Sequence, residues 1–389
     1  NLLGDVASLD LYVDDTLGFA ALGRSVSATG VELAAGSRTL KLRPAGESTL
    51  LFSGSYSLEG GAHYTAVAWG RSAVPRLSTL PEDYTDSDIG STDTRLRVLS
   101  ATQDGGLLDV YVTAETAVLA DATPRLSSVT AGQLTGFAEF PAGTWRLRVT
   151  GAGDVNDVRL DVGGVTLAPQ RHYSLVLSPA GGGVLVDGLL LLQQGTVLAL
   201  PNTQARVRIV ASAGSAAVVA VSRSGRTLAS GLRSPSVGPY LLVDAGDEAF
   251  TVRINGVVVD AGALPLAAGT DHTLLVMADG RVRLLVDDNR LPANSARMRL
   301  RLVHAVAGLD ELTLSVNYLA LLTDVAAGTG SEYLVSTTTS AALLEVTSPT
   351  QLAAVFSDDE VSLLANSVYT VFVLDGTTGG PTAVIRKER

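Results

Sequence analysis

Residue types that carry out acid–base or metal chemistry are scarce in this 389-residue chain. It contains four histidines and no cysteine, which excludes disulfides, thiolate nucleophiles and thiolate zinc sites. The histidines occupy positions of an internal repeat, and His63 and His172 share one column of it. His272 and His304 fall in two other columns. We therefore expect four structural histidines in separate domains, with no catalytic residue and no metal site.

Two acidic clusters are the remaining candidates for a cation site. The first contains Asp83, Asp86, Asp88 and Asp93. Its spacing differs from that of an EF-hand loop and no glutamate closes it, so we interpret it as a solvated linker. The second cluster, Asp358 to Glu360, is a run of like charge that we expect on an exposed turn.

Three phrases that partly resemble motifs for nucleophilic catalysis or phosphate binding do not match those motifs. The phrase GSYSLEG from Gly54 lacks the spacing of the GxSxG elbow. The phrase SRSGRT from Ser222 and the glycines 181–183 lead into no helix that could hold a phosphate, so we expect hairpin turns there. An enzyme is the least favoured class, and no cofactor is expected.

Composition argues against two further classes of protein, those that bind nucleic acid and those with a membrane-spanning helix. The formal net charge of -11 argues against binding to a phosphate backbone, so no nucleic-acid partner is expected. The longest apolar run, Leu189 to Leu200, is interrupted by Gln193 and Gln194 and is shorter than the roughly 20 residues of a spanning helix. We expect no transmembrane segment.

An internal repeat organises the sequence. Three similar phrases, RLRVLSA, RVRIVASA and RMRLRLVHA, begin at Arg95, Arg206 and Arg297. Further along each copy, a turn of small residues precedes a strand. A later strand of the same copy carries a hydroxyl residue. The hydroxyl positions, 109, 99 and 97 residues apart, are Thr65, Ser174, Thr273 and Thr370. Apolar residues alternate with polar ones between Gly-rich turns, which predicts antiparallel β structure with one sandwich per repeat.

The repeat predicts an all-β chain of four tandem immunoglobulin-like sandwiches. Their expected bounds are residues 1–88, 94–202, 204–293 and 295–389. Short joints containing Pro81, Pro201 and Pro292 favour a semi-rigid rod. A single short helix is expected from Ser348, where serine can cap and proline takes the first helical position.

The phrases RLVHAVAGLDELTLSV, RLRVLSATQDGGLLDVYV and LLGDVASLDLYVDD resemble a tandem domain of unknown function that is common in secreted and envelope proteins of bacteria. Members of that family have an opening strand that ends in His or Asn plus Ala, followed by a VDVYVDG-like strand. The resemblance implies an immunoglobulin-like sandwich in a secreted, extracellular or cell-surface protein. It carries no catalytic residues.

The first copy lacks its opening strand. Alignment of its LDLYV phrase with LLDVYV sets Asn1 against Ser100 and leaves nothing opposite Arg95 to Leu99. We expect this strand to alternate exposed arginines with buried apolar residues, so its absence would leave an apolar groove and an open edge that accepts a strand from another chain. The residues expected in such a subunit contact are Leu2, Leu3, Leu9, Leu11, Val13, Val384 and Ile385.

Two functional hypotheses follow. The first is a non-enzymatic extracellular structural protein that assembles with copies of itself, head to tail, into a cell-surface filament. In the second, the native polypeptide extends upstream by one strand and forms a monomeric surface rod. Such a rod could act as an adhesin that binds a polysaccharide or host ligand through its loops.

Overall fold

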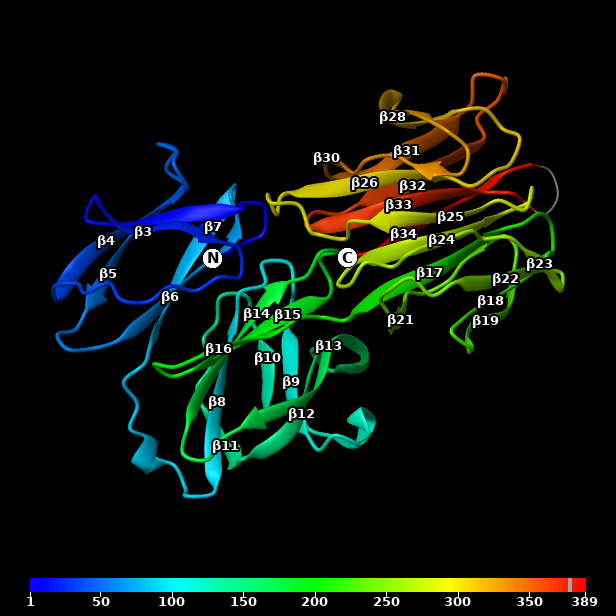
Figure 1. Cartoon of the computed structure of the whole chain (residues 1–389). Coiled ribbons are helices and arrows are strands. Elements are labelled where there is room, and N and C mark those ends of the chain that lie inside the picture. Colours follow the sequence, from blue (N-terminus) through cyan, green and yellow to red (C-terminus); the bar gives the residue numbers. More distant parts are fainter. Residues whose placement is uncertain (377–379) are drawn as a thin grey trace. The chain divides into compact units, whose positions relative to one another are not determined.

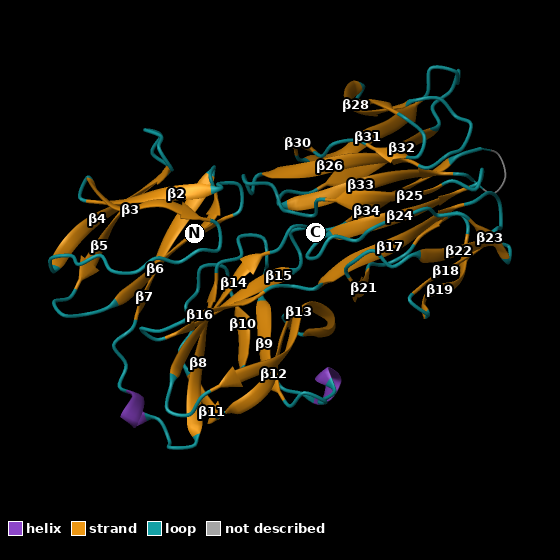
Figure 2. Cartoon of the chain, viewed as in Figure 1, coloured by secondary structure: helices purple, strands orange, loops and turns teal. Residues whose placement is uncertain are grey.

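The chain is built almost entirely from β-strands. The computed structural model describes residues 1–376 and 380–389, and Figures 1 and 2 show strands along its whole course. Within these residues there is no α-helix, and the only helical turns are η1 (Asp86–Asp88) and η2 (Leu119–Asp121). The helix expected from Ser348 is wrong, because residues 348–355 form turns and bends. The all-β prediction is confirmed.

Every sheet within the described residues draws its strands from one of four consecutive segments, which we call copies 1 to 4. In copy 1 a three-stranded sheet has the order β1-β6-β7 and a four-stranded sheet the order β3-β2-β4-β5. The strands of copy 1 are β1 (Leu2–Leu3), β2 (Ser8–Val13), β3 (Thr16–Gly23), β4 (Gly36–Pro44), β5 (Phe52–Leu58), β6 (Tyr64–Arg71) and β7 (Val74–Pro81).

Copy 2 has a five-stranded sheet with the order β11-β8-β14-β15-β16 and a four-stranded sheet with the order β10-β9-β12-β13. Its strands are β8 (Asp93–Ser100), β9 (Leu108–Thr113), β10 (Leu126–Val129), β11 (Ala138–Pro141), β12 (Gly143–Gly151), β13 (Asp154–Leu167), β14 (His172–Pro179), β15 (Val186–Leu192) and β16 (Val197–Leu200).

Copy 3 has the sheet orders β20-β17-β24-β25, with β21 also paired to β17, and β19-β18-β22-β23. Its strands are β17 (Gln204–Ser212), β18 (Val218–Arg223), β19 (Arg226–Arg233), β20 (Ser236–Val237), β21 (Leu241–Asp244), β22 (Phe250–Ile254), β23 (Val257–Val259), β24 (Asp271–Met277) and β25 (Val282–Asp287).

Copy 4 has the sheet orders β29-β26-β33-β34, with β30 also paired to β26, and β28-β27-β31-β32. Its strands are β26 (Arg297–His304), β27 (Leu312–Val316), β28 (Leu319–Val325), β29 (Thr329–Gly330), β30 (Leu334–Thr337), β31 (Thr339–Thr347), β32 (Phe356–Leu363), β33 (Ser367–Leu374) and β34 (Thr382–Lys387).

The opening strand of each complete copy makes a parallel pair. Strands β8, β17 and β26 each lie parallel to the strand with the hydroxyl residue, namely β14, β24 and β33. On their other side they pair antiparallel with β11, β21 and β30. The expectation of purely antiparallel pairing is wrong at this one position in each copy. A long stretch of chain separates the two parallel strands, as a parallel connection requires.

Side chains alternate between the two faces of each strand, and those that point inward fill the space between the two sheets of each copy. In β8, for example, Leu96 and Val98 point inward and belong to one buried apolar cluster with residues of β9, β12 and β14. Equivalent clusters fill copies 3 and 4. Each copy is therefore a sandwich with its own core.

The chain divides into two compact units. The first comprises residues 1–180 and 185–202, and the second comprises residues 181–184 and 203–389. Within the first unit, Val67 and Trp69 of copy 1 form one apolar cluster with Leu99 and Val176 of copy 2. Within the second, outward-facing residues of β17 and β24 form a similar cluster with those of β26 and β33. Two sandwiches thus pack face to face in each unit.

This packing buries the arginines that the sequence analysis placed on an exposed face. Arg97, Arg208 and Arg301 are 3%, 2% and 5% exposed, because the outer face of each opening strand covers the neighbouring sandwich. The expectation that they are exposed is wrong. The alternation itself was correct, but the outward face of the strand meets a second sheet instead of water.

We expect Phe372→Ala to destabilise the second unit. Phe372 is fully buried between the two sandwiches, beneath the guanidinium of Arg208. Truncation of a buried phenylalanine costs about 3–5 kcal/mol of unfolding free energy. Chemical denaturation checks this, with Leu352→Ala at a fully exposed position as the control. Equal stability of the two variants would contradict face-to-face packing.

Candidate interaction site: an open sheet edge in copy 1

The most distinctive surface of the chain is an unpaired edge of β6. The two residues of β1 pair with β6 only at its end, Leu2 with Trp69 and Leu3 with Gly70. Within the described residues, no strand pairs with Tyr64–Ala68 on the side where the other copies carry an opening strand. We call Tyr64–Ala68 the open edge. Continued by one residue, the register of β1 with β6 sets Asn1 beside Ala68, the position that Ser100 holds beside Leu177 in copy 2.

A second segment borders the same gap. Counted back from the Ala-Gly turn, Val31–Ala34 of copy 1 corresponds to β11 of copy 2 and β21 of copy 3. In those copies the strand pairs with the opening strand and buries Phe140 and Val243, each 4% exposed. In copy 1 the segment forms no strand, and Leu33 is 40% exposed. We call Val31–Ala34 the facing segment.

The interior of copy 1 is correspondingly open. Ala66 on the open edge points toward the sandwich interior and is exposed, whereas the equivalent Leu175, Leu274 and Val371 are fully buried. The apolar core of copy 1 contains only four buried residues, against 18 in copy 2 and 15 in copies 3 and 4. Among the described residues, no strand lies between the open edge and the facing segment.

Polar groups on the outer face of the gap repeat an arrangement found in copy 3. There, Nε of Arg208 donates to Oγ1 of Thr273 over 2.8 Å, and this hydroxyl donates to Oδ2 of Asp287 over 2.6 Å. In copy 1 the hydroxyl of Thr65 donates to the carboxylate of Glu82, which occupies the position of Asp287. The hydroxyl and the carboxylate are present in copy 1, and the opening-strand arginine is not.

Arg208, the buried arginine of the opening strand in copy 3, lies among several acidic and polar partners. Burial alone lowers the pKa of Arg208, but the fields of Tyr240, Asp287 and Glu388 outweigh this and raise its pKa above the ordinary value. Arg208 also bonds Glu388 over 2.6 Å, and Arg301 bonds Asp287 over 2.5 Å. Asp287 and Glu388, which hold equivalent positions in copies 3 and 4, thus bind the buried arginines of both sandwiches. Buried arginine requires such partners.

The structure places the residues expected in a subunit contact mostly inside copy 1. Leu3 and Leu9 belong to its buried core, with Leu11 packed against it. Leu2 is buried against copy 2, and Val13 is buried at the end of β2. The two C-terminal residues, Val384 and Ile385, lie in β34 and pair with Phe372 and Val371 of β33. They are already part of a sheet, so they do not form a free donor strand.

The histidines are held by separate partners. His63 and His172 each contact one aspartate, Asp83 over 2.7 Å and Asp86 over 3.1 Å. The buried ring of His272 contacts the hydroxyl of Thr270. His304 is fully buried, accepts a hydrogen bond from the backbone of Val306 and contacts the carbonyl of Asp310.

No group of three or more His, Asp or Glu side chains among residues 1–376 and 380–389 is arranged to hold a metal ion. In the linker, Asp83 and Asp86 are engaged by His63 and by Arg171. The expectation that Asp358 to Glu360 lie on a turn is wrong, because they lie on the exposed edge strand β32.

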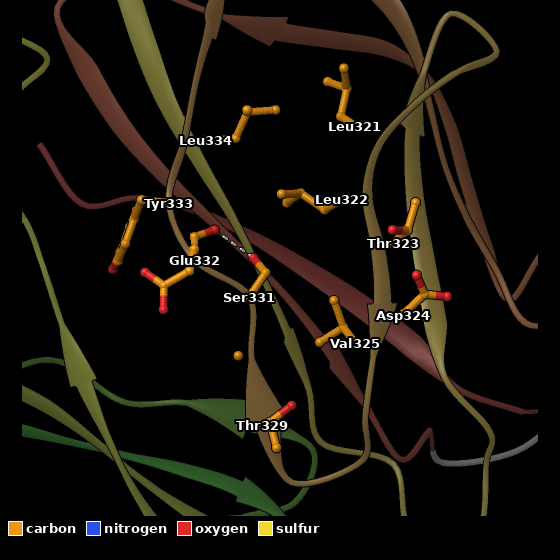
Figure 3. A pocket seen from close by; sticks show the side chains of 11 residues that line it. Leu321, Leu322, Thr323, Asp324, Val325, Thr329, Ser331, Glu332, Tyr333 and Leu334 are labelled. Atoms are coloured by element: carbon orange, nitrogen blue, oxygen red, sulfur yellow. Dashed lines mark hydrogen bonds between the residues drawn. The ribbon is translucent and has the colours of Figure 1, made fainter.

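A hollow of about 350 Å³ lies in copy 4 between β28 and residues 329–334. Figure 3 shows Leu322 and Val325 between the two segments, whereas Tyr333 lies on the far side of one of them. The ring of Tyr333 lies under the guanidinium of Arg301, and burial raises its pKa to about 12. The hollow is lined by both apolar and polar residues, and the carboxylates of Asp324 and Glu332 are exposed.

Comparisons with known proteins give a family match over part of the chain. The family described as "Domain of unknown function (DUF4397)" matches residues 1–111, which span copy 1 and continue through β8 into β9. No curated protein matches the chain. A solved structure titled "The Bacillus anthracis TIE protein" is 12% identical, with coverage of 88% of this chain and 60% of that chain and a TM-score of 0.16. A TM-score this low supports no argument.

No helix among the described residues combines the length and the apolar character needed to cross a membrane.

We expect the open edge to exchange its amide hydrogens rapidly. Amides of the facing segment and of Tyr64 and Ala66 should exchange about tenfold or more faster than those of β11 and of Tyr173 and Leu175, because β8 covers only the latter while the pairing of β6 with β7 leaves its outer side open. Hydrogen–deuterium exchange with mass spectrometry checks this on the full chain. Equal protection in copies 1 and 2 would contradict an open edge.

We also expect acid to destabilise the second unit through His304. Burial lowers the pKa of this ring, so the unfolded chain binds the proton at a higher pH than the folded chain. The free energy of unfolding should therefore fall as pH drops below about 6.5. Urea denaturation at pH 7.5 and 5.5 should show a smaller pH effect in His304→Gln. The exposed His63→Gln is the control, and an unchanged pH effect in His304→Gln would contradict the assignment.

Proposed function

We propose that this chain is a non-enzymatic extracellular structural protein whose copies join head to tail by strand addition at the open edge of copy 1. The observation that supports the proposal is that, among the described residues, no strand pairs with Tyr64–Ala68 on the side facing Val31–Ala34. Exposed strand edges are templates for pairing with another chain. A contact between two different surfaces repeats without closing and gives an open filament.

The rest of the molecule is suited to bearing load rather than to catalysis. Two face-to-face sandwiches in each unit share buried apolar layers. The histidines, the only side chains with an ordinary pKa near neutrality, bind separate local partners. Nothing among the described residues combines a nucleophile with a base and an orienting group.

Burial of apolar side chains would favour strand addition. An added strand would bury apolar side chains against Tyr64, Ala66 and Leu33, at about 1.5–3 kcal/mol for each leucine or valine. It would also satisfy the backbone groups on both sides of the gap. Two or three such residues approach the free energy of a micromolar complex before the cost of ordering the strand.

Negative-stain electron microscopy of the purified native protein tests the proposal. We expect filaments with a regular repeat, and we expect them to shorten when Ala66→Arg places a charge in the gap. Leu352→Arg, at a fully exposed loop position, is the matched control and should assemble normally.

Isolated particles at every protein concentration tested would overturn the filament. The alternative function, a monomeric surface rod or adhesin that binds a polysaccharide or surface ligand through its loops, would then be favoured. The rod-like arrangement expected from the short joints belongs to both functions and stays a prediction.

A further inference from the structure

We propose that the second unit carries two complementary docking faces, one on copy 3 and one on copy 4, through which two molecules of this chain bind each other. The basic face is the outward side of the sheet β19-β18-β22-β23, and the acidic face is the outward side of the sheet β28-β27-β31-β32. The basic face of one molecule binds the acidic face of another. This contact goes beyond the strand addition proposed above, because it uses no residue of copy 1.

The second unit has four layers of sheet, and these two sheets are the outer ones. One apolar core lies between the sheet of the basic face and the sheet that contains β17 and β24. A second apolar layer joins β17 and β24 to β26 and β33. A third lies between β26 and β33 and the sheet of the acidic face. The two faces of one molecule therefore point away from each other and can meet only between molecules.

Charged residues are segregated by sign between the two outer sheets. The strands of the first contain four arginines and no acid, whereas those of the second contain five acids and no arginine or lysine. The arginines are Arg223, Arg226, Arg233 and Arg253, and the acids are Asp324, Glu345, Asp358, Asp359 and Glu360. Two like faces repel each other, so the charges favour contact between unlike faces.

Strand alternation places arginines on the outward side of the first sheet. Val219 of β18 is buried in the core, so its neighbours Val218 and Ala220 point outward. Residues directly opposite one another share a face of the sheet. Arg233 lies opposite Val218, and Arg253 lies opposite Ala220. Both arginines are exposed, so they project from the basic face.

The same alternation places acids on the outward side of the second sheet. Leu344 of β31 is buried in the core, so the next residue, Glu345, points outward. It lies opposite Ser315 and Ser357, which are neutral. The edge strand β32 adds the exposed acids Asp358 to Glu360. The acidic face therefore carries negative charge with no cation beside it in the same sheet.

The equivalent sheet of copy 2 neutralises its charges internally. There, Arg146 of β12 bonds Asp161 of the neighbouring β13 over 2.6 Å. Arg253 of copy 3 instead donates to the backbone carbonyl of Gly256 over 3.1 Å. Within the part of the chain that the structure describes, no ion pair joins Arg253 or Arg233 to an acidic side chain. The charge of the basic face is therefore available to a partner.

Exposed apolar side chains accompany the charges on both faces. Val218 is 36% exposed, and Val258, which lies opposite Arg253, is 54% exposed. Beside the acidic face, the hairpin between β27 and β28 exposes Tyr318 and Leu319 by 82% and 66%. Burial of these side chains would stabilise the contact, while the charges select the unlike face.

Sedimentation velocity of the full chain in about 50 mM and about 500 mM NaCl tests the docking. We expect concentration-dependent oligomers at the lower salt that dissociate at the higher salt. The formal net charge of -11 makes molecules without complementary faces repel each other most at low salt, so general repulsion has the opposite salt dependence. The association should persist in Ala66→Arg, because strand addition has no part in it.

Reversal of charge on either face should weaken the association. Arg233→Glu combined with Arg253→Glu should weaken it about tenfold or more at low salt, and Asp359→Arg combined with Glu360→Arg should do the same. An equimolar mixture of these two double variants should associate again, because the unaltered acidic face of one meets the unaltered basic face of the other. A chain with all four substitutions should bind itself through the exchanged charges.

Glu47→Arg combined with Asp121→Arg is the matched control. It changes the net charge as much as reversal of the acidic face, at exposed positions of copies 1 and 2, and should leave the association unchanged. A chain that stays monomeric at low salt, or a mixture of the two double variants that fails to associate, overturns the proposal. Association that Ala66→Arg abolishes and charge reversal leaves intact also overturns it, and supports strand addition alone.

Discussion

The parallel pairing of the opening strand with the hydroxyl strand is the interaction on which the remaining structure depends. Its inward side chains, such as Leu96 and Val98, fill the sandwich. Its outward apolar residue, Leu99 in copy 2 or Val210 in copy 3, joins the layer that unites two sandwiches. One strand therefore connects the core of a copy to its neighbour. In copy 1 only Leu2–Leu3 pair with this side of β6, and there the buried core is smaller and the facing segment more exposed than in the other copies.

Buried charge is the second constraint. In the second unit, each sandwich supplies an acidic partner for a buried arginine of the other. In the second unit Asp287 of copy 3 binds Arg301 of copy 4, while Glu388 of copy 4 binds Arg208 of copy 3. Removal of one partner from such a network leaves an uncompensated buried charge. These pairs fix the register of two opening strands across an otherwise apolar layer. In the first unit Arg97 instead bonds the carbonyl of Pro81 and the hydroxyl of Tyr84.

Edges elsewhere in the chain are arranged differently from the open edge. The edge strand β32 carries the exposed acids Asp358 to Glu360, whose charge opposes pairing with another sheet. The open edge has no comparable charge of its own, since Tyr64, Thr65 and Ala66 are neutral. The acids beside it are Glu32, at the position of Glu139, which bonds Arg95 in copy 2, and Glu82, at the position of Asp287, which lies 3.6 Å from Arg208 in copy 3.

The sequence by itself determined the all-β class and the repeated arrangement of sheets, because alternation, turn residues and internal spacing are local or can be read by alignment. It also located the hydroxyl residue, whose arginine partner is set by pairing. Only the tertiary structure decided that Arg97 is buried, because alternation shows that a side chain faces outward but not what covers that face. The turn at Ser348 likewise replaced an expected helix because local capping signals do not outweigh strand pairing on both sides. The space between β6 and residues 31–34 could be recognised only from the tertiary structure, because its two sides are far apart in sequence. In the complete copies the equivalent segments lie on either side of the opening strand.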